Sequence, residues 1–130
     1  MAEIKISELS IGDWVRVDDF DKVLIKRVSA IDGTRNQIGI IKNNRSGIYW
    51  YYDDEFEPIP LTPEILEKNG WSKEYDDVWE YGVWRISQID KCLFVLYNEK
   101  YDYDFCVYID TVHQLQNALR LAGVGKEVEL

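Results

Sequence analysis

EPIPLTPEILEKNGW, residues 57–71, is the stretch that decides how this chain is organised, because it contains all three prolines. Its first two prolines lack the N–H that a sheet ladder needs, so they predict an extended connector where a sheet ends. The pair Thr62-Pro63 is typical of a helix start, and the pair Asn69-Gly70 is typical of a helix end. The sequence therefore predicts a proline elbow at residues 58–71 that includes a short helix.

Three apolar residues indicate how this helix is held. Leu61 stands where a hydrophobic staple onto Leu66 is expected, and Trp71 stands where a Schellman motif brings a residue onto Leu66 from the other end. We therefore expect a rigid elbow rather than a flexible linker. On this interpretation residues 1–57 and 72–130 are two lobes of one cooperative unit.

The lobe before the elbow, residues 1–57, has the pattern of short strands separated by turn residues. Strand-like runs begin near residues 14, 37 and 48, and a further one covers residues 22–31. A sheet of such short strands avoids exposed edges by closing on itself, so we expect a small β-barrel. The run Leu-x-x-Gly-Asp-x-Val that begins at Leu9 resembles SH3-like barrels.

The lobe after the elbow, residues 72–130, combines strands with one clear helix. Strand-like runs cover residues 77–81, 83–89, 92–97 and 105–109, and a helical pattern covers residues 111–122. Thr111 and Gln114 have the spacing of a capping box, and Gly123 is a stop signal. We therefore expect an α+β protein, in which an SH3-like barrel is joined by the elbow to an antiparallel sheet capped by one C-terminal helix. The alternating residues 126–130 are consistent with a last edge strand.

Composition narrows the classes of function. The net charge is −9, from 15 basic and 24 acidic residues, which argues against binding to duplex nucleic acid. No apolar run is long enough to span a membrane, and the charged N-terminus does not have the pattern of an export signal. We therefore expect a cytoplasmic protein whose two cysteines, Cys92 and Cys106, are reduced and buried.

Two segments support a resemblance. PIPLTPEILEKNGW (residues 58–71) and VHQLQNALRLAG (residues 112–123) resemble the signature stretches of small uncharacterised proteins encoded by phages and mobile elements of gut anaerobes. The apolar pattern between them is also similar. This resemblance implies a phage or mobile-element context. It implies no activity and no catalytic residues.

Aromatic residues are the first candidates for a binding surface. Strand alternation over residues 49–52 places Trp50 and Tyr52 on one face and the other two tyrosines on the opposite face. Exposed Trp and Tyr are typical anchors of protein interfaces, whereas buried ones would form a core shared by the two lobes. Trp79 and Trp84 carry the same two alternatives.

The polar side of the expected C-terminal helix is the second candidate. It carries His113, Gln116, Asn117 and Arg120, which either face solvent or contact a ligand. Together with Trp50, Tyr52 or Trp84 they would suit a small-molecule or nucleotide-binding protein. A Cys–His dyad and a hydrolase with paired carboxylates are the less favoured alternatives.

No motif of a known catalytic, phosphate-binding or zinc site occurs in the sequence. We therefore expect no catalytic residues, no metal and no cofactor. The favoured hypothesis is a non-enzymatic accessory protein that binds another protein, or its own copy, through an aromatic-rich surface. In a phage or mobile-element context such a protein would inhibit or redirect a host protein.

Overall fold

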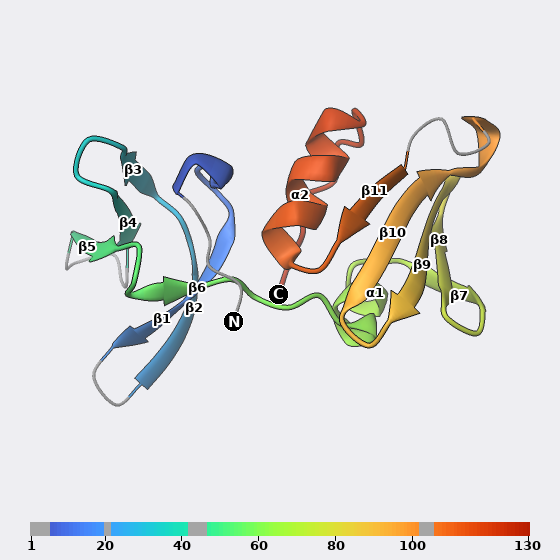
Figure 1. The fold of residues 1–130 in the computed structure, drawn as a ribbon, viewed down its shortest axis with the longest axis horizontal. Helices are drawn as coiled ribbons and strands as arrows, with labels where there is room; N and C mark the ends of the chain where they lie inside the picture. Colours follow the sequence, from blue (N-terminus) through green and yellow to red (C-terminus); the bar gives the residue numbers. More distant parts are fainter. Residues whose placement is uncertain (1–5, 20–21, 42–46, 102–105) are drawn as a thin grey trace. The chain divides into compact units, whose positions relative to one another are not determined.

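The computed structural model describes residues 6–19, 22–41, 47–101 and 106–130. The chain divides into two compact units, Met1–Ile59 and Pro60–Leu130 (Figure 1). All strand pairs among the described residues are antiparallel, and two α-helices accompany them, so the predicted α+β class is confirmed. The helix of the elbow belongs to the second unit. Cooperative unfolding of the whole chain stays a prediction.

The first unit contains two three-stranded sheets, with strand orders β2-β1-β6 and β3-β4-β5. A single 3₁₀ turn precedes them. The elements of the first unit are η1 (Ile6–Glu8), β1 (Trp14–Asp19), β2 (Lys22–Arg27), β3 (Ala30–Asp32), β4 (Gln37–Ile41), β5 (Ile48–Tyr52) and β6 (Phe56–Glu57).

The expected closure of this lobe into a barrel is wrong, because the two sheets stay separate among the described residues. The chain changes sheet at Val28-Ser29. The N–H of Val28 donates to the carbonyl oxygen of Asp13, which continues the pairing with β1, whereas the N–H of Ser29 donates to the carbonyl oxygen of Gly39 in β4. A strand predicted to run through residues 22–31 is therefore two strands with different partners.

Both sheets of the first unit contribute to one hydrophobic core. Val15 and Val17 enter it from β1, and Ile38 and Ile40 enter it from β4. These four side chains have no more than traces of exposed surface. Tyr51 and Phe56 complete the core from β5 and β6. Burial of this apolar surface is what holds two small sheets together without a closed ladder.

The second unit is a five-stranded antiparallel meander with strand order β11-β10-β9-β8-β7 and two α-helices. The strand β7 was not predicted, since its residues show no apolar alternation. The elements are α1 (Pro63–Lys68), β7 (Ser72–Tyr75), β8 (Val78–Tyr81), β9 (Trp84–Asp90), β10 (Leu93–Asn98), η2 (Glu99–Tyr101), β11 (Cys106–Ile109) and α2 (Val112–Leu121).

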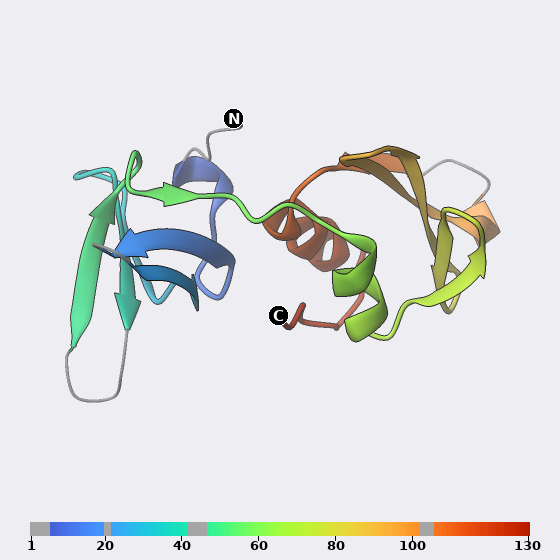
Figure 2. The same ribbon diagram turned by 90° about the horizontal axis from the view of Figure 1, so that it is seen from below.

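One face of this sheet is buried, and Figure 2 shows the sheet curving around α2. Ile86, Phe94 and Ile109 are fully buried members of that face, and the ring of Trp79 meets the ring of Phe94 edge-on at 6.3 Å. The apolar positions of α2 are buried as well, as its period of 3.6 residues predicts.

Both helices end as the sequence predicts. At α1 the N–H of Trp71 donates to the carbonyl oxygen of Leu66 (3.1 Å), and the N–H of Gly70, with φ +86°, donates to that of Glu67 (3.2 Å). These are the two bonds of a Schellman motif. The end of α2 has the same motif. There the N–H of Val124 donates to the carbonyl oxygen of Leu119, and the N–H of Gly123 donates to that of Arg120.

The two helix starts are also capped. The hydroxyl oxygen of Thr62 accepts from the N–H of Ile65, and that of Thr111 accepts from the N–H of Gln114. In the expected capping box the side chain of Gln114 accepts a hydrogen bond from the backbone of the N-cap residue, but here the donor is the residue before the N-cap. The side-chain oxygen of Gln114 accepts from the N–H of Asp110 (2.8 Å) instead of that of Thr111.

The C-terminal residues do not form the expected edge strand, because two side-chain amides hold them instead. Gln116 accepts from the N–H of Val128 (2.6 Å) and donates to the carbonyl oxygen of Lys126 (3.3 Å). Asn69 accepts from the N–H of Glu129 (2.7 Å) and donates to its carbonyl oxygen (2.7 Å). These amides supply the hydrogen bonds that a neighbouring strand would otherwise supply. We call these contacts the amide clamps.

Candidate functional site

The outer face of the sheet β3-β4-β5 carries a cluster of exposed apolar side chains. Trp50 is 44% exposed and Tyr52 is 53% exposed, whereas Tyr51 between them is 7% exposed and lies in the core. The register places Ile41 opposite Ile48 on the same side of the sheet as Trp50. We call Ile41, Ile48, Trp50 and Tyr52 the aromatic face.

Gly39 forms the floor of the aromatic face. It lies opposite Trp50 in the ladder and opposite Ala30 in the other direction. A Cβ atom at this position would come within 2.6 Å of the Cγ2 atom of Ile48 and 3.3 Å of the Cζ3 atom of Trp50. The absence of a side chain therefore lets Ile48 and Trp50 lie across the neighbouring strand.

Acidic residues follow the aromatic face directly. Asp53, Asp54 and Glu55 form the exposed turn between β5 and β6. Asp32 ends β3, the other edge strand of the same sheet, and its carboxyl group accepts hydrogen bonds from residues of the turn that follows. The hydroxyl of Thr34 donates to its Oδ1 atom (2.6 Å), and this bond holds the pKa of the Asp32 carboxyl below its usual range. Asp53 and Asp54 place two exposed carboxyl groups directly after Tyr52 in the chain.

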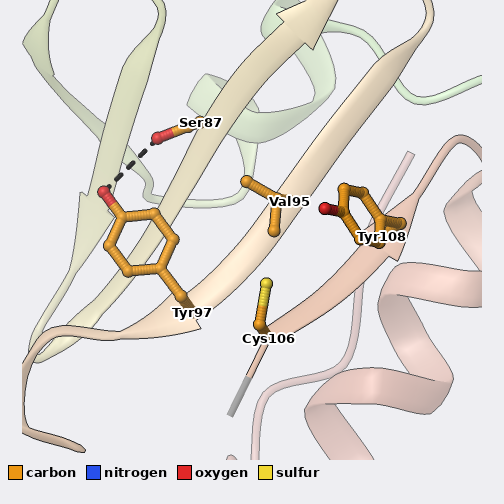
Figure 3. A pocket seen from close by; sticks show the side chains of 5 residues that line it. All are labelled: Ser87, Val95, Tyr97, Cys106 and Tyr108. Carbon is orange, nitrogen blue, oxygen red and sulfur yellow. Dashed lines mark hydrogen bonds between the residues drawn. The ribbon is translucent and has the colours of Figure 1, made fainter. Parts of the chain in front are cut away.

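A second candidate lies on the outer face of the five-stranded sheet. An open hollow of about 300 Å³ is lined there by Ser87, Val95, Tyr97, Cys106 and Tyr108. Figure 3 shows Val95 between the rings of Tyr97 and Tyr108. The hydroxyl of Ser87 donates to that of Tyr97 (3.3 Å), and the thiol of Cys106 points into the hollow. This combination of aromatic walls and few hydroxyls is typical of a small ligand site. We call it the tyrosine hollow.

Arg85 stands beside Tyr97 in the register and organises the same face. Its guanidinium pairs with Glu74 (2.7 Å), Glu80 (3.3 Å) and Glu99 (2.7 Å). It also donates to the carbonyl oxygens of Gly82 and Trp84. Since its donors are engaged by these groups, Arg85 ties β7, β8 and β9 to η2 and is not available to a ligand.

The sequence-predicted site residues are divided between the two units. Trp50 and Tyr52 belong to the first unit, whereas the other candidates, Trp79, Trp84, His113, Gln116, Asn117 and Arg120, belong to the second. Trp79 is a core residue on the inner side of the sheet, and Trp84 is half-buried at the start of β9.

The expected polar side of α2 is only partly solvent-facing. His113 is 3% exposed and Gln116 is 2% exposed, so these two residues do not lie on a solvated face. Gln116 is buried because the C-terminal residues cover it, and the Nδ1 atom of His113 lies 3.1 Å from the hydroxyl of Thr111. Asn117 and Arg120 are partly exposed, and Arg120 contacts Glu127 (3.5 Å).

The expectation of buried cysteines is wrong. Cys92 lies in the turn between β9 and β10, and Cys106 lies on the outward side of β11, so both free thiols are exposed. The alternation of residues 93–98 and 106–109 contains the signal for the tyrosine hollow, since every second residue must face outward.

The described part of the chain offers neither a metal-binding cluster nor a membrane-spanning helix. Among residues 6–19, 22–41, 47–101 and 106–130, no cluster of His, Cys, Asp and Glu side chains could hold a metal ion. No helix in this part of the chain is long and apolar enough to cross a membrane.

Comparison with known proteins identified no relative. No family model matches the chain, and neither a curated protein nor a solved structure does.

Proposed function

We propose that this chain is a non-enzymatic binding module that engages another protein through the aromatic face. The observation that carries this proposal is the exposure of Trp50 and Tyr52 next to Ile41 and Ile48 on one side of a small sheet. Trp and Tyr are the residues most often found as energetic anchors of interfaces. A contiguous exposed apolar patch is also atypical of a surface that contacts only water.

The wider setting of this proposal comes from the sequence. The resemblance of residues 58–71 and 112–123 to phage and mobile-element proteins favours an accessory protein that acts in the cytoplasm of a host. There it would inhibit or redirect a host protein. The fold proposed for the first unit is SH3-like and open. The chain runs from β1 to β2, changes sheet at Val28-Ser29, continues through β3, β4 and β5, and returns to β1 with β6, and this order supports the proposal.

The test is the double variant Trp50→Ser and Tyr52→Ser. A host protein captured by the full chain is purified, and its affinity is measured by calorimetry for both forms. We expect the dissociation constant to rise by roughly 30-fold, because a central aromatic anchor contributes about 2 kcal/mol or more. The circular dichroism spectrum should not change, since both side chains are exposed.

The matched control is Tyr75→Ser with Ile89→Ser, which removes an exposed aromatic and an exposed aliphatic residue from the second unit. It should leave the affinity unchanged. Equal affinity of the wild-type chain and the Trp50/Tyr52 variant would contradict the proposal. Light scattering of the free chain tests self-association, where a dimer lost in the same variant would replace a heterologous partner by a second copy.

A second candidate function is supported by the tyrosine hollow. About 300 Å³ is at the lower end of the volumes that hold small ligands. The chemistry of its walls suits a flat, mainly apolar molecule with one polar group near the hydroxyls of Ser87 and Tyr97. This differs from the sequence-based hypothesis, in which Trp50 and His113 would share one ligand.

The hollow can be tested through the thiol of Cys106. In a Cys92→Ser background Cys106 is the sole thiol, and its rate of reaction with a maleimide can be followed directly. A ligand in the hollow should slow this reaction severalfold, because the thiol points into the hollow. A panel of aromatic carboxylates, nucleosides and flavonoids that leaves the rate unchanged would count against this second candidate.

A further inference from the structure

We propose that the outer edge of β5 binds a partner by adding an extended, basic segment of another protein as a further strand of the sheet β3-β4-β5. This inference rests on the proposed function and specifies how the partner is held. Main-chain hydrogen bonds to β5 would supply affinity. Apolar side chains on the aromatic face and a cationic side chain near Asp53 and Asp54 would supply selectivity.

The backbone of β5 directs hydrogen-bonding groups outward. The N–H of Tyr52 donates to the Oε1 atom of Glu55 (2.9 Å), and the carbonyl oxygen of Tyr52 accepts from the N–H of Glu55 (2.9 Å). Tyr52 and Gln37 therefore face each other as a non-hydrogen-bonded pair. Since the two kinds of pair alternate along an antiparallel ladder, Trp50 and Ile48 belong to non-hydrogen-bonded pairs too.

The neighbouring strand gives independent support for this assignment. The carbonyl oxygen of Gly39 accepts from the N–H of Ser29 (2.8 Å), so it points toward β3 and away from Trp50 opposite it. The N–H and C=O groups of Ile48 and Trp50 consequently point toward the outer edge of the sheet, where no described strand pairs with β5. A partner strand would find two residues there, spaced as a ladder requires.

The composition of the edge strands singles out β5. Proteins protect exposed edges with charged residues, bulges or very short strands. At other edges of the described sheets, β2 carries Lys22, Lys26 and Arg27, and β7 carries Lys73, Glu74 and a register shift. The remaining uncharged edge strand is β11, and there Leu61 donates to the carbonyl oxygen of Asp110 just past the strand. The five residues of β5 contain no charge, no proline and no bulge.

Charge selects the kind of strand that fits. Asp53, Asp54 and Glu55 follow β5 immediately, and the chain as a whole carries −9. A second copy of this chain would bring the same negative charge to the edge, whereas a basic segment would be attracted to it. The partner is therefore expected to alternate apolar and basic residues.

The experiment is an NMR titration of the ¹⁵N-labelled full chain with a capped Val-Lys-Val-Lys-Val peptide. We expect shifts of the amides of Ile48, Trp50, Asp53 and Asp54, and none for the charge-reversed Val-Glu-Val-Glu-Val peptide. Asp53→Asn with Asp54→Asn should weaken binding roughly fivefold at low salt, since exposed charge pairs are weak individually. The control Glu67→Gln with Asp76→Asn, which removes two exposed charges of the second unit, should not.

Backbone pairing is tested separately. Two N-methylated forms of the basic peptide are compared, one methylated at the valine nitrogens and the other at the lysine nitrogens. Each form lacks the N–H groups along one of the two edges of the peptide strand. Only one of them should lose binding, because only one edge faces β5. Ile48→Pro, which removes an outward N–H at the first residue of an edge strand, should abolish binding, whereas Ile48→Ala should weaken it less.

The outcomes separate this inference from the proposed function. Equal binding of both N-methylated peptides, or of the acidic peptide, would overturn strand addition by a basic segment. If the binding of a host protein still depends on Trp50 and Tyr52 in that case, the proposed function stands and only the mode of binding is wrong. If neither the peptides nor any protein depends on the aromatic face, both fail. A dimer of the free chain that Ile48→Pro dissociates would assign the edge to a second copy and overturn the heterologous partner.

Discussion

Replacing Leu66 by alanine should lower the free energy of unfolding by about 2–5 kcal/mol, because the substitution leaves a cavity in a packed core. Leu66 is fully buried at the end of α1, and its carbonyl oxygen accepts the N–H of Trp71 in the Schellman motif. Leu61 and Trp71 on either side of the helix are buried as well. The measurement is equilibrium unfolding in urea, followed by circular dichroism.

The matched control is Leu121→Ala in α2, the same chemical change at a side chain that is 84% exposed. It should alter stability by no more than about 0.5 kcal/mol. A loss of under 1 kcal/mol in Leu66→Ala would contradict the structural role assigned to the helix of the elbow.

The Leu66 variant also tests the prediction of one cooperative unit. Hydrogen exchange of the first-unit core, at Val17 and Ile38, reports on the stability of residues that lie outside the mutated unit. If the chain unfolds as one unit, exchange there should accelerate together with exchange at Phe94 in the second unit. Unchanged protection of Val17 and Ile38 would show two independent units.

Removing the amide clamps should have the second large effect. Gln116→Leu replaces the amide with an apolar side chain of similar size, which leaves the buried N–H of Val128 without its acceptor. We expect the free energy of unfolding to fall by about 1–3 kcal/mol. Asn69→Ala removes two bonds to Glu129 and one to the carbonyl oxygen of Ile65, so a similar loss is expected. Because both side chains hold the same C-terminal residues, the double variant should lose less than the sum of the two single variants.

Hydrogen exchange at Val128 is the specific readout, and it should accelerate in both clamp variants by more than global destabilisation explains. Glu127→Gln is the control in the same segment. It removes an exposed ion pair with Arg120 (3.5 Å), which should contribute at most about 1 kcal/mol. Unaltered exchange at Val128 in Gln116→Leu would contradict the clamp.

Features encoded within a few residues were predictable from sequence. The Thr62 cap, the Gly70 and Gly123 stops and both Schellman motifs depend on side chains and φ angles inside one short segment. Strand alternation likewise predicted that Trp50 and Tyr52 lie on the face opposite Tyr51. The exposure of that face required the structure, since alternation separates two faces without saying which one the core covers.

Features that join distant segments were not predictable in the same way. The change of partner at Val28-Ser29 depends on Asp13 and Gly39, and it leaves two sheets where a closed barrel was expected. Periodicity placed Gln116 and His113 on the polar side of α2, and the burial of both residues shows that this side is only partly solvent-facing.

The sequence by itself determined the α+β class, the helix ends and the two sides of β5, because propensity, capping and alternation are local properties of the chain. Only the tertiary structure decided which of those sides meets water and that Gln116 holds the C-terminal residues. It alone also decided that Tyr97, Cys106 and Tyr108 surround a hollow. The physical reason is that burial and long-range hydrogen bonding depend on which segments meet in space, and a period along the chain does not specify its partner.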